Sequence, residues 1–292
     1  MTDSPLQNRI VVVTGAARGL GAELARACAR RGARLALLGL EKPRLDALAA
    51  DLPTPALAVE TDVTDPAALA DAADETRRRL GRPSVVVANA GVAHGGPFAT
   101  SDPAEWRRVV EVNLSGSAHT VRAFLPDLLD TAGYHLQIAS LASLGAAPLM
   151  SAYCASKTGV EAFTHSLRAE VAHRGVAVGI AYLNWIDTDM IRDADRYPVL
   201  RELRAHMPPP ARRTFPPEDV AARLVRAVER RRTAVYVPGW LRLVQWGRVT
   251  LPPAVVRLSR HELPRMEAEG ALGHTGPLGA GGLADRAADT GQ

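Results

Sequence analysis

Short apolar runs alternate with longer helical stretches through the first 190 residues, and this alternation constrains the fold more than any other feature. The runs are apolar on both faces, as expected for parallel strands that helices cover on each side. The pattern therefore predicts an α/β fold, a doubly wound parallel sheet of the Rossmann type with about seven strands. The expected strands are residues 10–13, 35–38, 56–59, 85–88, 136–139, 176–181 and 234–237.

The alternation weakens near residue 190, and this divides the chain into parts. We expect a single domain, residues 1–239, that binds a dinucleotide and carries the catalytic groups. Within it, the charged and proline-containing segment 190–215 is predicted to form a substrate lid. Residues 240–292 are predicted to be a C-terminal extension that is partly disordered, because residues 270–292 are rich in Gly and Ala.

The composition of the 292-residue chain excludes several classes of protein. Apolar residues make up 47% and charged residues 23%, which is typical of a globular protein. Aromatic residues make up only 4% and the net charge is only +4, so we expect no nucleic-acid partner. No apolar run reaches the roughly 20 residues of a transmembrane helix. Two cysteines and a short polar N-terminus predict a cytoplasmic protein, and the spacing of the histidines predicts no metal site.

A glycine-rich turn, Thr-Gly-Ala-Ala-Arg-Gly-Leu-Gly at residues 14–21, joins the first expected strand to the first expected helix. Gly15 permits the sharp turn, Gly19 allows close approach of a ligand, and Gly21 allows the helix to pack on the sheet. The N-terminus of that helix offers free N–H groups and a positive dipole end to a pyrophosphate. A purely structural tight turn is the alternative, but the strand–turn–helix context favours dinucleotide binding.

Tyr153 and Lys157 lie four residues apart in an expected helix and therefore share one face. Lysine occurs at only one other position, Lys42. A nearby ammonium favours the phenolate, which would bring a tyrosine into the working range of a general base. Ser140, at the end of an expected strand, could hydrogen-bond a carbonyl oxygen or a developing alkoxide. The alternative is an ordinary surface pair on an amphipathic helix.

Taken together, these motifs resemble the short-chain dehydrogenase/reductase family over about residues 8–240. The glycine turn, Asn89-Ala90-Gly91, Asn113, Ser140 and the Tyr153–Lys157 pair match that family in order and spacing. The resemblance implies that Tyr153 is the general acid/base, that Lys157 lowers its pKa and holds the nicotinamide ribose, and that Ser140 orients the substrate oxygen. It also implies that Asn113 supports a water relay to Lys157.

The resemblance further implies a set of cofactor contacts. Asn89 would brace the fourth strand, Asp62 and Val63 would contact adenine, and Thr188 would contact the nicotinamide carboxamide. The expected cofactor-binding residues are Gly15, Arg18, Gly19, Leu20, Gly21, Gly39, Asp62, Val63, Asn89, Ala90, Gly91, Tyr153, Lys157, Ile186 and Thr188.

The choice between NAD(H) and NADP(H) rests on conflicting residues. Gly39 stands where an Asp would hold the adenosine ribose hydroxyls, and Leu40 stands where NADP-binding members often carry Arg. Without that carboxylate a 2′-phosphate is not repelled, and Arg18 could reach it. Glu41 is close enough to favour NAD(H) instead. The balance favours NADP(H), with NAD(H) as the alternative.

Three features bear on the substrate and leave alternatives open. Asn184-Trp185 replaces the family's Pro-Gly after the sixth strand, and Trp185 either shapes the substrate pocket or packs beneath the next helix. The helically spaced Leu200, Leu203 and Met207 form either the underside of the lid or an internal packing face. Residues 240–259 are a subunit contact, a pocket extension or an interfacial membrane helix, of which we favour the subunit contact.

The sequence therefore predicts an NAD(P)-dependent alcohol dehydrogenase or ketoreductase that acts on a fairly hydrophobic secondary alcohol or ketone. The resemblance implies a homodimer or homotetramer. A catalytically silent dinucleotide-binding regulator or scaffold is one alternative. An enoyl reductase or epimerase on the same fold is another.

Overall fold

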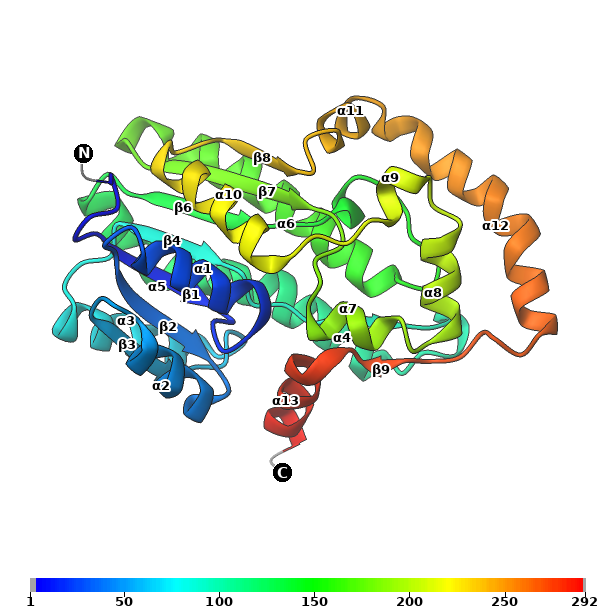
Figure 1. Cartoon of the computed structure of the whole chain (residues 1–292), viewed down its shortest axis with the longest axis horizontal. Helices are drawn as coiled ribbons and strands as arrows, with labels where there is room; N and C mark the ends of the chain where they lie inside the picture. Colours follow the sequence, from blue (N-terminus) through cyan, green and yellow to red (C-terminus); the bar gives the residue numbers. More distant parts are fainter. Residues whose placement is uncertain (1–3, 291–292) are drawn as a thin grey trace.

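The computed structural model describes residues 4–290, which form a doubly wound α/β domain with a helical C-terminal extension (Figure 1). The central sheet has seven strands in the order β3-β2-β1-β4-β6-β7-β8, and every neighbouring pair is parallel. The predicted fold is thus confirmed. The strands are β1 (Ile10–Thr14), β2 (Arg34–Gly39), β3 (Ala56–Glu60), β4 (Val85–Ala88), β6 (Tyr134–Ile138), β7 (Ala177–Leu183) and β8 (Ala234–Val237).

Successive strand residues point to opposite faces of the sheet, so each strand contributes to two apolar layers. Val11 and Val13 pack in one layer with the helices on one side, and Ile10 and Val12 pack in the other. The first layer contains α1 (Gly19–Ala29), α2 (Lys42–Asp51) and α10 (Pro217–Glu229). The second contains α3 (Pro66–Arg79), α4 (Pro103–Val110), α5 (Gly116–Asp130) and α6 (Ser151–Val171).

Chain order reverses between β1 and β4, and this places the crevice of the domain at their carboxyl ends. Three short helices follow β7 near this edge: α7 (Asp189–Ala194), α8 (Pro198–Ala205) and α9 (Pro209–Arg212). They occupy the segment predicted to be a lid. Leu200 is buried there, whereas the side chain of Leu203 lies outside the described part of the structure.

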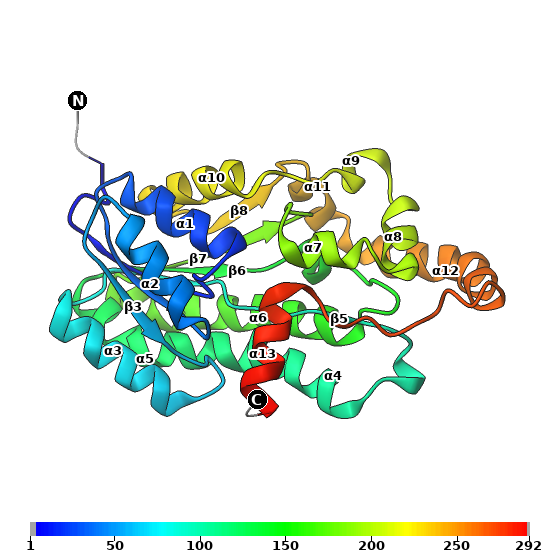
Figure 2. The same ribbon diagram turned by 60° about the horizontal axis from the view of Figure 1, so that its bottom comes forward.

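The C-terminal extension forms helices and a short strand up to residue 290, where composition led us to expect partial disorder. It contains α11 (Leu241–Trp246), α12 (Leu251–Ala268), β9 (Gly276–Pro277) and α13 (Gly279–Thr290). β9 pairs with β5 (His94–Gly95) in a separate antiparallel ribbon. Figure 2 shows α13 between α7 and α4. The glycines that suggested disorder permit close packing, because a Cβ on Gly279 would lie 2.7 Å from the Met190 Cα.

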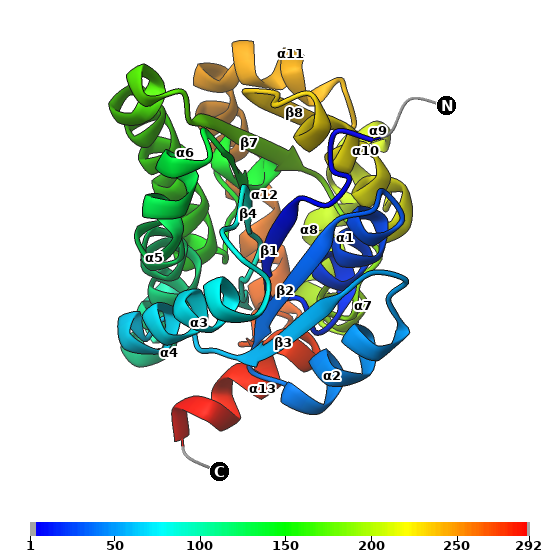
Figure 3. The same cartoon turned by 90° about the vertical axis from the view of Figure 1, so that its left-hand side faces the viewer.

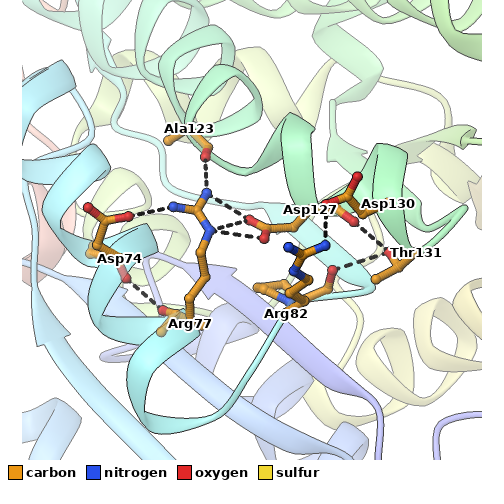
Figure 4. A network of polar contacts seen from close by, with 10 residues as sticks. Asp74, Arg77, Arg82, Ala123, Asp127, Asp130 and Thr131 are labelled. Atoms are coloured by element: carbon orange, nitrogen blue, oxygen red, sulfur yellow. Dashed lines mark hydrogen bonds and ion pairs between the residues drawn. The ribbon is translucent and has the colours of Figure 1, made fainter.

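Arg77 joins α3 to α5 through a nearly buried carboxylate (Figure 4). Its guanidinium donates to both oxygens of Asp127 at 2.9–3.1 Å and to the carbonyl oxygen of Ala123 at 3.1 Å. The side chain of Asp127 is only 3% exposed. A charge buried to this extent depends on its partner, because removing the partner leaves the desolvation cost uncompensated.

We expect Arg77→Met to lower the free energy of unfolding by about 3 kcal/mol, since it leaves the Asp127 carboxylate buried without a cation. Urea unfolding followed by circular dichroism measures the change. Arg78→Met is the matched control, because Arg78 is 64% exposed and pairs with Glu75 on the same helix surface. Such an exposed pair contributes at most about 1 kcal/mol. Equal urea midpoints for the two variants would contradict this account.

Candidate active site

The glycine turn after β1 is fixed against the end of β4. Asn89 Nδ2 donates to the carbonyl oxygens of Thr14 at 2.9 Å and Gly15 at 3.3 Å. The Thr14 hydroxyl accepts from the backbone N–H groups of Asn89 and Ala90 at 3.0 and 3.1 Å. Asn89 therefore holds the turn and the start of α1 in one position, which supports its predicted bracing role.

Close approach explains why glycine is required in this turn. Gly15 has φ +63°, and a Cβ there would lie 2.9 Å from the Ala90 Cα. A Cβ on Gly21 would overlap the Gly15 carbonyl oxygen. Arg18 precedes α1 without capping it through its side chain. The first N–H groups of α1 thus face a cradle that fits the pyrophosphate of a dinucleotide.

Every predicted cofactor-binding residue lines one continuous cleft at the carboxyl ends of the strands. Figure 3 shows the sheet between its two helical layers, with α13 beyond the edge near β3 and α2. The cleft also contains Ser140, Tyr153 and Lys157, so the structure brings the catalytic candidates and the glycine turn into a single site. One wall of this cleft was not predicted from the sequence; it is formed by Leu278, Gly281, Ala284 and Asp285.

Tyr153, Lys157 and Ser140 converge on the floor of the cleft. The Lys157 Nζ lies 5.7 Å from the centroid of the Tyr153 ring and donates to the Ile138 carbonyl oxygen at 3.3 Å. Ser140 follows β6 and accepts from the Ala142 N–H at 3.1 Å, which fixes the short turn that carries it. Ser140 lies in the loop between β6 and α6, whereas Tyr153 and Lys157 lie on α6.

Burial shifts the pKa of both catalytic candidates on α6. Burial raises the pKa of the Tyr153 phenol, while the adjacent Ser140 hydroxyl lowers it. Burial also lowers the pKa of Lys157 to about 8. Lys157 therefore remains mostly protonated at neutral pH, although the protein interior reduces its preference for the charge.

Asn113 lies beneath the cleft rather than in its lining. It is fully buried in a π-helical turn, Glu111–Ser115, between α4 and α5. Its side chain accepts from the Val92 N–H at 2.8 Å and donates to the Val92 carbonyl oxygen at 3.0 Å and to the Ser156 hydroxyl at 2.9 Å. Asn113 thus joins the segment after β4 to α6, and its predicted relay to Lys157 remains a prediction.

Arg18, which was expected to meet a 2′-phosphate, is engaged by two carboxylates. It forms a short ion pair with Glu41, and its Nη1 lies 3.3 Å from an Asp189 carboxylate oxygen. Hydrogen bonding to Glu41 raises the pKa of Arg18. A phosphate at this position would have to share Arg18 with Glu41.

Trp185 supports the packing interpretation of the unusual Asn184-Trp185 pair. The Arg204 guanidinium lies 5.7 Å from the Trp185 ring, and the Trp185 carbonyl oxygen accepts from the Phe215 N–H at 2.9 Å. Asn184 lines the cleft and donates to the Ala211 carbonyl oxygen at 3.1 Å. Trp185 therefore contacts α8 and the segment after α9, while Asn184 faces the site.

Comparison with known proteins agrees with this geometry. A family model described as short chain dehydrogenase matches residues 9–197. The chain belongs to the short-chain dehydrogenase family. Members of this family are oxidoreductases that use NAD or NADP, bind small-molecule substrates and usually form oligomers.

Three members of the short-chain dehydrogenase family illustrate the degree of similarity in sequence and structure. An uncharacterised oxidoreductase of Staphylococcus saprophyticus is 29% identical over 77% of this chain and 92% of its own. An acetoacetyl-CoA reductase of Synechocystis is 32% identical over 74% of this chain and 86% of its own. A crystal structure of a family member from Burkholderia phymatum in complex with NAD has a TM-score of 0.72 and 28% identity, covering 84% of this chain and 94% of that one.

Within residues 4–290, every helix is too short or too polar to span a lipid bilayer. These residues also contain no group of three or more His, Cys, Asp or Glu side chains arranged to hold a metal ion.

Proposed function

We propose that the protein interconverts a secondary alcohol and a ketone, with Tyr153 as the general acid/base. The observation that carries this proposal is the convergence of Ser140, Tyr153 and Lys157 on the cleft that begins at the glycine turn. When bound, a nicotinamide dinucleotide supplies or accepts the hydride. The protein's own groups then have to position the substrate oxygen and move one proton.

Each of the three side chains has a role that its position supports. In ketone reduction the Tyr153 phenol donates its proton to the oxygen as negative charge develops there. The Ser140 hydroxyl donates a hydrogen bond to the same oxygen and orients the carbonyl. The Lys157 ammonium stabilises the phenolate that remains, and its burial strengthens this electrostatic effect.

The surroundings of Tyr153 support a fairly hydrophobic substrate. Tyr153 packs against an apolar cluster that includes residues of the loop before α6, of α7 and α8, and of the C-terminal extension. We assign residues 190–215 as the substrate lid, because Leu200 is buried in this cluster. The partly buried members are Leu149, Met150, Met190, Tyr197, Leu263, Ala271 and Leu272.

We further propose that NADP(H) is favoured over NAD(H). Gly39 at the end of β2 leaves no carboxylate to repel a 2′-phosphate, and Arg18 lines the same part of the cleft. The Glu41 carboxylate weakens the preference for NADP(H), because it already pairs with the Arg18 guanidinium.

Tyr153→Phe should lower kcat by about 10²–10⁴-fold, the usual contribution of a positioned acid/base, while the Kd for the cofactor changes little. Turnover of a homologous series of 2-alkanones with NADPH and NADH, together with fluorescence titration of both cofactors, measures the two effects. Tyr236→Phe is the control, since Tyr236 lies on β8 and stacks on Tyr182. Retained turnover in Tyr153→Phe would reject the mechanism.

The pH dependence should follow the burial of Tyr153 and Lys157. Alcohol oxidation needs the phenolate, and burial raises the pKa of Tyr153, so kcat/KM for oxidation should rise across the neutral range. The pKa of Lys157 is lowered to about 8, so its charge is present below that pH and is lost above it. Lys157→Met should move the rising limb to higher pH, because the phenolate loses its neighbouring cation. An unchanged profile in this variant would contradict the assignment.

Glu41→Gln should increase the affinity for NADPH relative to NADH by about tenfold, because it releases Arg18 from a charge-assisted pair. Parallel fluorescence titrations give both dissociation constants. Glu60→Gln, an exposed change at the end of β3, is the matched control. A gain for NADH alone would show that Glu41 does not restrain Arg18.

A further inference from the structure

The C-terminal segment 274–290 lies along the dinucleotide cleft, where composition alone predicted disorder. Figure 2 shows α13 between α7 and α4. Leu278, Gly281, Ala284 and Asp285 line the same cleft as the glycine turn. The segment is therefore part of the wall of the proposed cofactor site.

The start of this segment is attached by backbone pairing. β9 pairs with β5, which follows the Asn89–Gly91 motif, and Leu278 N–H donates to the Ala93 carbonyl oxygen at 3.0 Å. The Gly279 N–H donates to an Asp193 carboxylate oxygen at 2.9 Å. Leu278 is only 2% exposed. These contacts fix the segment between the β4 loop and α7.

Glycine allows α13 to approach the phosphate-binding turn. Gly279 has φ +71°, and its Cβ would meet the backbone of Met190 at 2.7 Å. A Cβ on Gly281 would lie 3.7 Å from the Arg18 Cδ, so residue 281 faces the turn itself. A side chain larger than methyl at position 281 would extend toward Arg18.

Arg108 joins α13 to the opposite wall of the cleft. Its Nε and Nη2 donate to the two oxygens of Asp285 at 3.1 and 2.8 Å, and the same Nη2 donates to Asp62 at 3.0 Å. Its Nη1 donates to the Thr64 hydroxyl at 3.0 Å. The side chains of Arg108 and Asp285 are 16% and 9% exposed. The largely buried Arg108 guanidinium thus contacts both Asp285 in α13 and Asp62, the residue expected to contact adenine.

We propose that residues 274–290 form a strap that closes the adenosine end of the cleft, with the Arg108–Asp285 pair as its latch. The proposal rests on the proposed function, because it assigns the strap to retention of the dinucleotide. Gly281 and Ala284 line the path by which the dinucleotide leaves. Asp285 acts through Arg108 as a positioning residue.

Stopped-flow displacement of the bound dinucleotide tests the strap on the full-length protein, with NADPH or NADH, whichever binds more tightly. Asp285→Asn should raise the dissociation rate about tenfold, because interface changes act mainly on dissociation. Gly281→Leu should weaken binding by obstructing the cleft. Leu283→Ala is the control on the same helix, since Leu283 is 58% exposed.

The outcomes separate this proposal from the proposed function. If the unmodified protein binds neither dinucleotide, the proposed function fails. If it binds one and the dissociation rates of Asp285→Asn and Gly281→Leu equal that of Leu283→Ala, the strap proposal is overturned. Tighter binding in Asp285→Asn also overturns it, since the segment would then obstruct the site rather than retain the ligand.

A different observation concerns residues 230–261, which contain seven arginines and no Asp or Glu. This stretch includes α11 and the first part of α12, which form the outer edge of the molecule in Figure 1. Exposed apolar side chains concentrate there: Leu243 (74%), Trp246 (81%), Val249 (79%), Val256 (51%) and Leu258 (44%).

We infer that this surface, residues 240–260, binds an anionic lipid bilayer. Exposed Trp and Leu beside arginines, with no acid to repel lipid phosphates, are typical of helices that lie in a membrane interface. Arg248 is held by Glu161 at 2.9 Å, whereas Arg242, Arg257 and Arg260 are exposed. A second copy of this chain would place the same arginines against one another across a two-fold interface.

Co-sedimentation with vesicles tests this surface. The protein should pellet with vesicles that contain phosphatidylglycerol, less so at high salt, and not with phosphatidylcholine alone. The double variant Leu243→Ala/Trp246→Ala should remain in solution. Phe98→Ala, an equally exposed change elsewhere on the molecule at 69%, is the control. Absence of pelleting, or a fall in oligomer size in the double variant alone, would overturn the proposal.

Discussion

The contact between the glycine turn and the end of β4 is the constraint on which the site depends. Thr14 and Asn89 exchange hydrogen bonds across the point where the strand order reverses. Gly21 can pack over the Gly15 carbonyl oxygen only because it lacks a Cβ. The start of α1 is therefore fixed relative to β4. The chain after β4 then continues to Gly91, directly above Asn113 and Lys157.

The same constraint determines how charge is buried in the site. A Cβ on Gly91 would lie 3.5 Å from the Lys157 Nζ and 3.1 Å from the Asn113 Oδ1. The backbone thus covers the ammonium closely, and its burial lowers the pKa of Lys157 to about 8. Asn113 maintains this arrangement by bonding both backbone groups of Val92. Asn113 lies in a π-helical turn, where the backbone departs from regular α-helical geometry and directs the side-chain amide inward. Such turns are frequent at functional sites.

The sheet and the proximity of Tyr153 to Lys157 could be predicted because their signals are local in sequence. Each strand is a short apolar run, and the Tyr153–Lys157 spacing alone places both side chains on one helical face. The tail could not be predicted in this way. The role of Gly279 and Gly281 depends on Met190 and Arg18, which are distant in sequence, and a glycine-rich segment has the same composition whether it packs closely or remains disordered.

The ion pair between Arg18 and Glu41 could not be predicted from the sequence either. Both residues bear on cofactor choice, but their pairing depends on the distance between two separate βα turns. The second carboxylate, Asp189, comes from the start of α7. Three parts of the chain therefore determine whether the Arg18 guanidinium is free to bind a 2′-phosphate. No single spacing between residues in the sequence predicts this.

Arg108 forms ion pairs both with Asp285 in the C-terminal segment and with Asp62 in the cleft. Because Asp62 and Asp285 share one guanidinium, a change that weakens the Asp285 bond also alters the environment of Asp62. Burial raises the pKa of Asp285 despite the cation, whereas hydrogen bonds from Thr64 and Arg108 keep the pKa of Asp62 low despite its own burial. Asp285 is thus the member of the pair that gives up its charge first as the pH falls. Under the strap proposal, binding in the cleft and docking of α13 are linked equilibria, in which the effect of each on the other is equal.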